Sequence, residues 1–189
     1  MILAQLPFKT LYQNKWLELR ETSTGYVYVY SPWDGGRGAA ILVYKEDTSA
    51  ITSPDEDNPH RLYLARYEVC PAHGDEYEIT SIAGGMDKAG EHSYQCAVRE
   101  LEEEGGIKLS PDADVKYLGH VRSSKTSANY MYLYSVRLTD TNHTVVEILG
   151  DGTPTEEGAY CKWLTEQEYI DQCNDPIVCT MLLRNQYVD

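Results

Sequence analysis

The sequence has few basic residues for its length. Its 189 residues include 16 lysines and arginines against 30 aspartates and glutamates, which gives a formal net charge of −14. A protein that binds duplex DNA or an anionic membrane by neutralising phosphates needs a basic surface. The composition therefore disfavours both partners. It leaves a small phosphorylated substrate open, because bound metal ions reverse the sign of the local field.

Closely spaced cysteine pairs and long apolar runs are also missing. The cysteines are Cys70, Cys96, Cys161, Cys173 and Cys179, an odd number without a Cys-x-x-Cys pair. These spacings indicate neither a disulfide framework nor a zinc site. No stretch approaches the length of a membrane span, and the N-terminal residues lack the basic start and apolar run of a secretory signal. We therefore expect a cytoplasmic protein with free thiols and no membrane partner.

A folded domain is expected despite the acidic charge, because hydrophobic residues make up 42% of the chain. The length suits one main domain, which we expect over residues 35–189. A small N-terminal β extension is expected over residues 1–34. The boundary falls in the turn-rich stretch 31–38, Ser-Pro-Trp-Asp-Gly-Gly-Arg-Gly.

Most of the remaining pattern predicts strands. Apolar, β-branched and aromatic runs predict them at residues 9–20, 25–30, 39–44, 61–69, 76–82, 115–121, 130–138 and 159–164. Polar loops are expected at residues 46–59 and 147–158. Near the C-terminus, Thr165-Glu166-Gln167-Glu168 is typical of a capping box and predicts a helix over 165–173, and a second short helix is expected over 176–184. The element order predicts an α/β or α+β fold.

The most informative segment begins at Gly85 and reads GMDKAGEHSYQCAVRELEEEGGI. It predicts a helix, with Ser93 as the candidate N-cap and Gly105-Gly106 as the C-terminal stop. Apolar residues recur along it at helical spacing and predict one core-facing stripe. That stripe consists of Tyr94, Ala97, Val98 and Leu101.

Three glutamates of the same helix, Glu100, Glu103 and Glu104, are three and four residues apart and share one face. Carboxylates this close repel one another unless a cation lies among them, and oxygen ligands favour Mg²⁺ or Mn²⁺. Arg99 lies off that face but can reach back to Glu91, so we expect it to orient a carboxylate. The alternative is a solvated acidic helix. The fixed spacing of the flanking residues argues against that alternative.

The segment resembles the Nudix box, Gly-x5-Glu-x7-Arg-Glu-U-x-Glu-Glu-x-Gly-U with U apolar, and every defining position is filled. The resemblance implies the Nudix fold, a mixed β-sheet between helices. It also implies a Mg²⁺- or Mn²⁺-dependent pyrophosphohydrolase, in which a metal-activated water attacks a phosphoanhydride. The implied metal ligands are the Gly84 carbonyl, Glu100, Glu103 and Glu104. The implied structural residues are Gly85, Glu91 and Gly106.

The resemblance places the catalytic groups at four positions. Glu103 is a metal ligand or a basic group, and Arg99 holds the loop and helix together with Glu91. Related enzymes carry carboxylates on the loop before the last strand, where this chain has Glu156 and Glu157. Glu157 is the first choice for a general base and Glu156 the second. Both residues also fit solvated loop acids.

Outside the box, Lys-Thr-Leu-Tyr-Gln-Asn-Lys-Trp at residues 9–16 resembles the opening of ADP-ribose and nucleoside-diphosphate-sugar pyrophosphatases. In that subgroup N-terminal strands often build a homodimer, which we expect here. The implied substrate is a small nucleoside diphosphate derivative, with Arg66, Arg122 and Lys125 as candidate binding residues. The loop at 122–128 lacks the proline common in ADP-ribose enzymes. Nucleoside triphosphates, dinucleoside polyphosphates and a non-catalytic nucleotide-binding regulator remain as alternatives.

Overall fold

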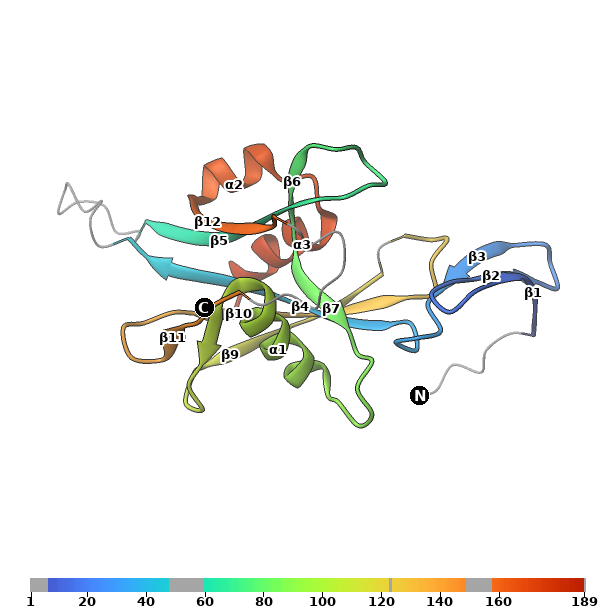
Figure 1. Ribbon diagram of the computed structural model, residues 1–189, viewed down its shortest axis with the longest axis horizontal. Coiled ribbons are helices and arrows are strands. Elements are labelled where there is room, and N and C mark those ends of the chain that lie inside the picture. The colour runs from blue at the N-terminus through green and yellow to red at the C-terminus, as the bar shows by residue number, and fades with distance from the viewer. Residues whose placement is uncertain (1–6, 48–59, 123, 149–157, 189) are drawn as a thin grey trace.

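The structure is a computed structural model that describes residues 7–47, 60–122, 124–148 and 158–188 (Figure 1). The strands are β1 (Phe8–Gln13), β2 (Glu18–Thr22), β3 (Val27–Tyr30), β4 (Arg37–Glu46), β5 (Arg61–Val69), β6 (Tyr77–Thr80), β7 (Ile82–Gly85), β8 (Ile107–Leu109), β9 (Val115–Val121), β10 (Tyr130–Arg137), β11 (His143–Val145) and β12 (Tyr160–Thr165). The helices are α1 (Ser93–Gly105), α2 (Glu166–Gln172) and α3 (Pro176–Asn185).

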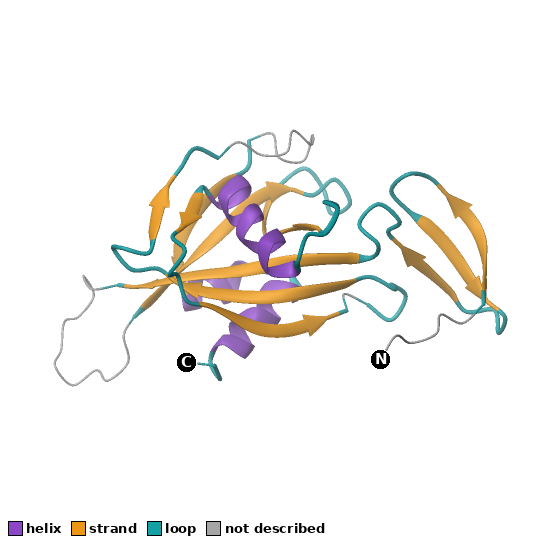
Figure 2. Ribbon diagram, turned by 90° about the horizontal axis from the view of Figure 1, so that it is seen from below, coloured by secondary structure: helices purple, strands orange, loops and turns teal. Residues whose placement is uncertain are grey.

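A mixed seven-stranded sheet forms the centre of the molecule. Its main path is β12-β5-β4-β10-β9, with β6 paired to β5 and β7 paired to β4. The β4–β10 pair is parallel, and the other pairs are antiparallel. Helix α1 covers one face, while α2 and α3 cover the other (Figures 1 and 2). The predicted arrangement of a mixed sheet between helices is therefore confirmed.

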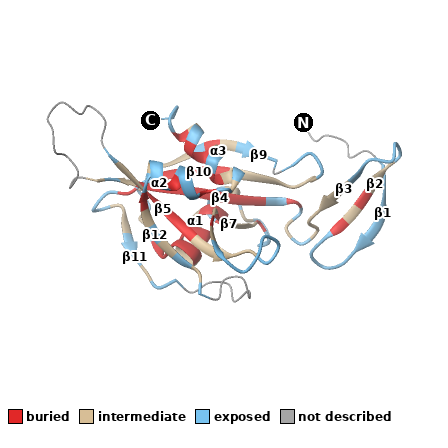
Figure 3. Ribbon diagram, turned by 90° about the horizontal axis from the view of Figure 1, so that it is seen from above, coloured by how far each residue is buried: buried red, intermediate tan, exposed pale blue. Residues whose placement is uncertain are grey.

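Strand β4 is buried on both faces because successive side chains of a strand point to opposite sides of the sheet. Ala40, Leu42 and Tyr44 pack in the core beneath α2 and α3. The intervening residues 39, 41 and 43 pack in a second core against α1. Figure 3 shows this buried strand at the centre. The second core holds α1 beside β7.

The N-terminal strands form a separate three-stranded sheet, β1-β2-β3, beside the main body (Figure 3). It contacts the body where the Val29 amide donates to the Thr126 carbonyl at 2.8 Å. The single strand expected over residues 9–20 is wrong. The chain turns at Asn14, whose side chain accepts hydrogen bonds from the amides of Trp16 and Leu17. The division of the chain at residue 34 stays a prediction.

Two further differences from the predicted elements follow from how the strands pair. The strand expected over 76–82 is broken at Ser81, whose amide donates to the Asp175 carboxylate at 2.8 Å, so β6 and β7 pair with different strands. The short strands β8 and β11 pair with each other and carry too few residues for a recognisable pattern. Much of the expected loops at 46–59 and 147–158 lies outside the described residues. Among the described helices, none has the length and apolar character needed to cross a membrane.

Candidate active site

The N-cap of helix α1 lies one residue before the expected one. The N-cap is His92, whose amide donates to the Gln95 side chain at 2.9 Å. Ser93 is not the cap, because its hydroxyl bonds the Tyr134 hydroxyl at 2.7 Å. At the other end Gly106 adopts a left-handed conformation with φ of 63°, which stops the helix as predicted. A Cβ on Gly106 would also lie 2.9 Å from Ile148.

The buried face of α1 is shifted from the predicted stripe. Cys96, Ala97 and Leu101 are fully buried, whereas Tyr94 is 45% exposed. The expected place of Tyr94 in the core is therefore wrong. The thiol of Cys96 packs inward and its pKa is raised to about 12, chiefly by burial. On the side of α1 that faces β7, Glu100 lies against Gly84 and Glu104 accepts from the Ala83 amide.

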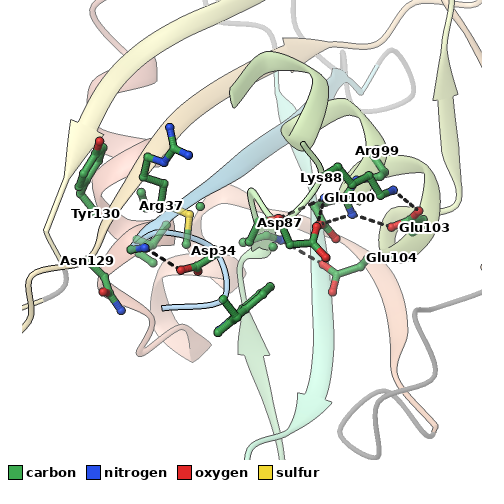
Figure 4. Close-up of a pocket in the computed structure, with 18 of the residues that line it drawn as sticks. Asp34, Arg37, Asp87, Lys88, Arg99, Glu100, Glu103, Glu104, Asn129 and Tyr130 are labelled. Carbon is green, nitrogen blue, oxygen red and sulfur yellow. Dashed lines mark hydrogen bonds and ion pairs between the residues drawn. The ribbon is translucent and has the colours of Figure 1, made fainter. Parts of the chain in front are cut away.

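Glu100, Glu103 and Glu104 line one cavity of about 770 Å³ (Figure 4). Glu100 and Glu104 are 7% and 9% exposed, and Glu103 lies nearer the solvent. The remaining lining residues are Trp16, Trp33, Asp34, Gly36, Arg37, Gly38, Glu68, Ala83, Gly84, Gly85, Asp87, Lys88, Arg99, Asn129, Tyr130, Met131 and Ile177. The shared face predicted for the three carboxylates thus opens into a cavity large enough for a small ligand.

Glycines at the end of β7 let the glutamates and an aromatic ring approach the backbone. A Cβ on Gly84 would lie 1.9 Å from Oε1 of Glu100, and a Cβ on Gly85 would lie 2.2 Å from the Trp33 ring. Neither position has room for a side chain. The Glu100 carboxylate therefore rests directly against the Gly84 backbone. The Gly84 carbonyl and the Glu100 carboxylate are thus close to each other.

Arg99 links the box loop to the glutamates. Its Nε donates to Glu91 at 3.0 Å, and its Nη1 donates to Glu100 and Glu103 at 2.6 and 2.9 Å. Nη2 also donates to the Gly85 carbonyl at 3.2 Å. Burial opposes the charge, but the surrounding carboxylates outweigh burial and raise the pKa of Arg99. The contact with Glu91 is the one that the sequence predicts for this residue.

Glu104 is a buried carboxylate beside Arg66 of β5. Burial raises its pKa to about 8, and the charge of Glu100 acts in the same direction. Arg66 and the Ala83 amide, which donates to Glu104 at 3.0 Å, act against this rise. Ionising this carboxylate is costly in the metal-free protein. A cation bound nearby would favour its charged form.

The donor set fits a hard divalent cation. Three carboxylates and the Gly84 carbonyl offer only oxygen, the ligand type that Mg²⁺ and Mn²⁺ prefer. Gly84 lacks the Cβ that would fill the space beside Glu100. The residues that would hold such an ion are therefore Gly84, Glu100, Glu103 and Glu104.

Replacing Arg99 by methionine is expected to destabilise the metal-free protein by about 2 kcal/mol or more, because three half-buried or buried carboxylates lose their shared cation. The free energy of unfolding, measured by urea titration in EDTA, tests this. Arg137→Met is the matched control, since Arg137 forms an exposed pair with Glu46 and such pairs contribute at most about 1 kcal/mol. Equal stabilities of the two variants would contradict the role assigned to Arg99.

The other predicted binding residues lie elsewhere. Arg66 is only 2% exposed and bonds Glu68 and the Glu104 carbonyl, so it supports the helix from behind the cavity. Arg122 and Lys125 are exposed on the loop after β9, and Arg122 donates to the Ala128 carbonyl. None of these cations is among the lining residues in the described part of the chain. Glu156 and Glu157 lie outside the described residues.

Sequence reasoning missed the aromatic and basic residues that line the cavity from outside the box. They are Trp16, Trp33, Arg37 and Tyr130, and all come from segments distant from the box. Figure 4 shows Arg37 and Tyr130 on the side opposite the glutamates. One signal was available, because Trp33 stands in a Pro- and Gly-rich turn, where a large aromatic side chain has no core to fill.

Comparison with known proteins places this geometry in a family. A search of curated proteins found no match. Among solved structures, the crystal structure of an ADP compounds hydrolase is similar, with a TM-score of 0.61 and 17% sequence identity over 97% of this chain and 92% of that chain. That likeness supports the fold. Residues 37–179 match the NUDIX domain family. Because these residues make up most of the chain and include the complete box, the protein belongs to the NUDIX domain family.

Proposed function

We propose that this Nudix pyrophosphohydrolase cleaves the phosphoanhydride of a nucleoside diphosphate linked to a second group, as in ADP-ribose or a nucleotide sugar. The observation that carries the proposal is the shared cavity. Glu100 and Glu104 lie on one side, and the indole rings of Trp16 and Trp33 belong to the same lining. A substrate with a planar base and a diphosphate needs both features in one site.

The tryptophan pair supports a nucleobase as one end of the substrate. The two rings have centroids 5.8 Å apart and meet edge to face at 82°. Trp16 and Trp33 are 53% and 42% exposed, which is unusual for tryptophan. Exposed indole rings beside a cavity offer a surface on which any base can stack. The structural neighbour is itself a hydrolase of ADP compounds, which is consistent with this substrate class.

The charged residues support a diphosphate between the base and the glutamates. A divalent cation at Gly84, Glu100, Glu103 and Glu104 would polarise the phosphoanhydride and lower the pKa of a bound water. Arg37 and Lys88 bring positive charge to the cavity lining, where each can contact phosphate or ribose oxygens. Arg99 is a positioning residue, since its hydrogen bonds go to the carboxylates and the loop.

Removal of a proton from the attacking water is assigned to a carboxylate outside α1. Glu157 remains our first candidate and Glu156 the second, on the resemblance of their loop to related enzymes. Glu103 is the alternative within the described residues, because it lines the cavity and is its most solvent-accessible box glutamate. A comparison of Glu157→Gln, Glu156→Gln and Glu103→Gln by pH–rate profile separates these choices, because losing the base removes the acidic limb.

A substrate panel tests the proposed function. Purified protein is incubated with Mg²⁺ or Mn²⁺ and ADP-ribose, nucleotide sugars, nucleoside triphosphates or dinucleoside polyphosphates, and the products are identified by chromatography and mass spectrometry. We expect a nucleoside monophosphate and a sugar phosphate from one of the first two classes. Preference for triphosphates would replace the substrate class. Inactivity towards the whole panel with retained nucleotide binding would overturn the enzymatic function.

We also propose a cytoplasmic homodimer that forms through the N-terminal sheet. Every residue of β1 is exposed, including the apolar side chains of Phe8, Leu11 and Tyr12. Leu11→Glu should dissociate the dimer, because the charge would be buried at the interface. Light scattering after size exclusion should then give the molar mass of one chain instead of two. Leu183→Glu, at an exposed leucine of α3, should leave the mass unchanged. A single-chain mass for the unaltered protein would refute the dimer.

A further inference from the structure

A cluster of mixed metal-ligand side chains lies in the hairpin between β5 and β6. Cys70 follows the last residue of β5, His73 lies in the turn, and Glu78 belongs to β6. One potential ligand atom from each residue lies within 4.8 Å of the other two. The cysteine spacing alone does not predict this set, because only one of its three members is a cysteine.

The hairpin backbone holds the three residues together. The amides of His73 and Gly74 both donate to the Cys70 carbonyl, at 2.8 and 3.2 Å, and close the turn. Glu78 is fixed by the pairing of β6 with β5, in register with Glu68. Nδ1 of His73 lies 2.5 Å from a Glu78 carboxylate oxygen. Two of the three side chains are thus already in contact.

The chemistry of the set differs from that of the active cavity. A thiolate, an imidazole and a carboxylate are the ligands of Zn²⁺ and similar transition metals, whereas Mg²⁺ favours oxygen alone. Zinc–ligand bonds of about 2.0–2.3 Å in a tetrahedron place ligand atoms roughly 3.3–3.8 Å apart. The observed cluster is therefore within a small side-chain adjustment of that geometry. A histidine–glutamate pair alone would be an ordinary surface contact, but the thiol within reach adds the third donor.

We propose that Cys70, His73 and Glu78 form a binding site for Zn²⁺ or a chemically similar transition-metal ion, with water at the fourth position. None of the three lines the active cavity in the described part of the chain. His73 is exposed and the other two are half-buried, so an ion can enter from solvent. A bound ion would cross-link the ends of β5 and β6 and stabilise the hairpin.

Cobalt(II) titration of the full chain tests the site. A thiolate ligand gives Co²⁺ a charge-transfer absorption in the near ultraviolet, and the oxygen ligands of the active cavity give none. We expect this band to saturate at one Co²⁺ per chain and to disappear when Zn²⁺ is added. Cys70→Ser should remove it, and His73→Ala should weaken Co²⁺ affinity by at least about tenfold, the effect already typical of losing an outer-shell partner.

Cys179→Ser is the matched control, because Cys179 is an exposed cysteine outside the cluster, and it should keep the band. A second measurement uses the unaltered protein, so it does not depend on the folding of a variant. Zn²⁺ should slow alkylation of Cys70 by iodoacetamide, followed by peptide mass spectrometry, and leave Cys179 unaffected. Absence of the band from the unaltered protein, or its persistence in Cys70→Ser, would overturn the proposal. Either result leaves the proposed hydrolase function untouched.

Discussion

Glu104→Gln is expected to lower kcat for the preferred substrate by at least about 100- to 1000-fold, the range typical of removing one charged group that acts on the reacting centre. Glu104 is buried against β5 and β7, and it shares the cavity with Glu100 and Glu103. Glutamine keeps the volume of the side chain and removes its charge. Steady-state hydrolysis and Mg²⁺ or Mn²⁺ titration calorimetry measure the loss of activity and of ion affinity together.

Glu102→Gln is the matched control for this variant. Glu102 lies in the same helix but faces solvent, where it pairs with Lys108 at 2.8 Å. Its replacement should leave kcat within about twofold, since exposed pairs contribute little. If Glu104→Gln kept a tenth or more of the activity, the carboxylate would not be part of the ion site, and the assignment of the box helix to catalysis would fail.

Trp33→Ala is expected to raise KM by roughly 5- to 150-fold, because stacking of a base on an aromatic ring is worth about 1–3 kcal/mol. The ring rests against Gly85 and forms part of the cavity lining. The effect on kcat should be smaller, since the lost contact is made equally in the ground state and the transition state. Initial rates over a range of substrate concentrations separate the two parameters.

Two further variants sharpen this test. Trp33→Phe keeps a smaller ring and should recover part of the affinity. Tyr117→Ala removes an aromatic side chain that is 52% exposed on β9 and is not among the cavity residues, so KM should not change. A Trp33→Ala enzyme with an unaltered KM would mean that the base binds elsewhere, while the glutamate result would still stand.

The sequence predicted those parts of the site that are encoded locally. Glu100, Glu103 and Glu104 occupy consecutive turns of one helix, so their spacing alone places them on one face. Trp16 and Trp33 were missed because their position depends on contacts between distant segments: the Trp33 ring rests against Gly85, and Trp16 meets Trp33 edge to face. Long-range packing of this kind leaves no periodic signal in the sequence.

The same distinction explains two of the errors in the fold. Strands β5 and β9 end where predicted, because their apolar runs stop at clear turn signals. The break at Ser81 depends on a hydrogen bond to Asp175, which lies 94 residues away. The N-cap was misplaced by one residue because Ser93 is used by Tyr134 of a distant strand. In each case a polar partner from elsewhere in the chain overrode the local pattern.

The two-sided burial of β4 has a consequence for how the chain tolerates insertions. A single residue inserted after Gly38 would exchange the side chains of the two cores, because a slip of one residue turns every side chain to the opposite face. It would also change the pairing register of β5, β7 and β10 together, since all three pair with β4. The fold should therefore tolerate insertions and deletions in the surface turns but not within residues 38–44. There the register of β4 sets the positions of the strands that carry the cavity residues.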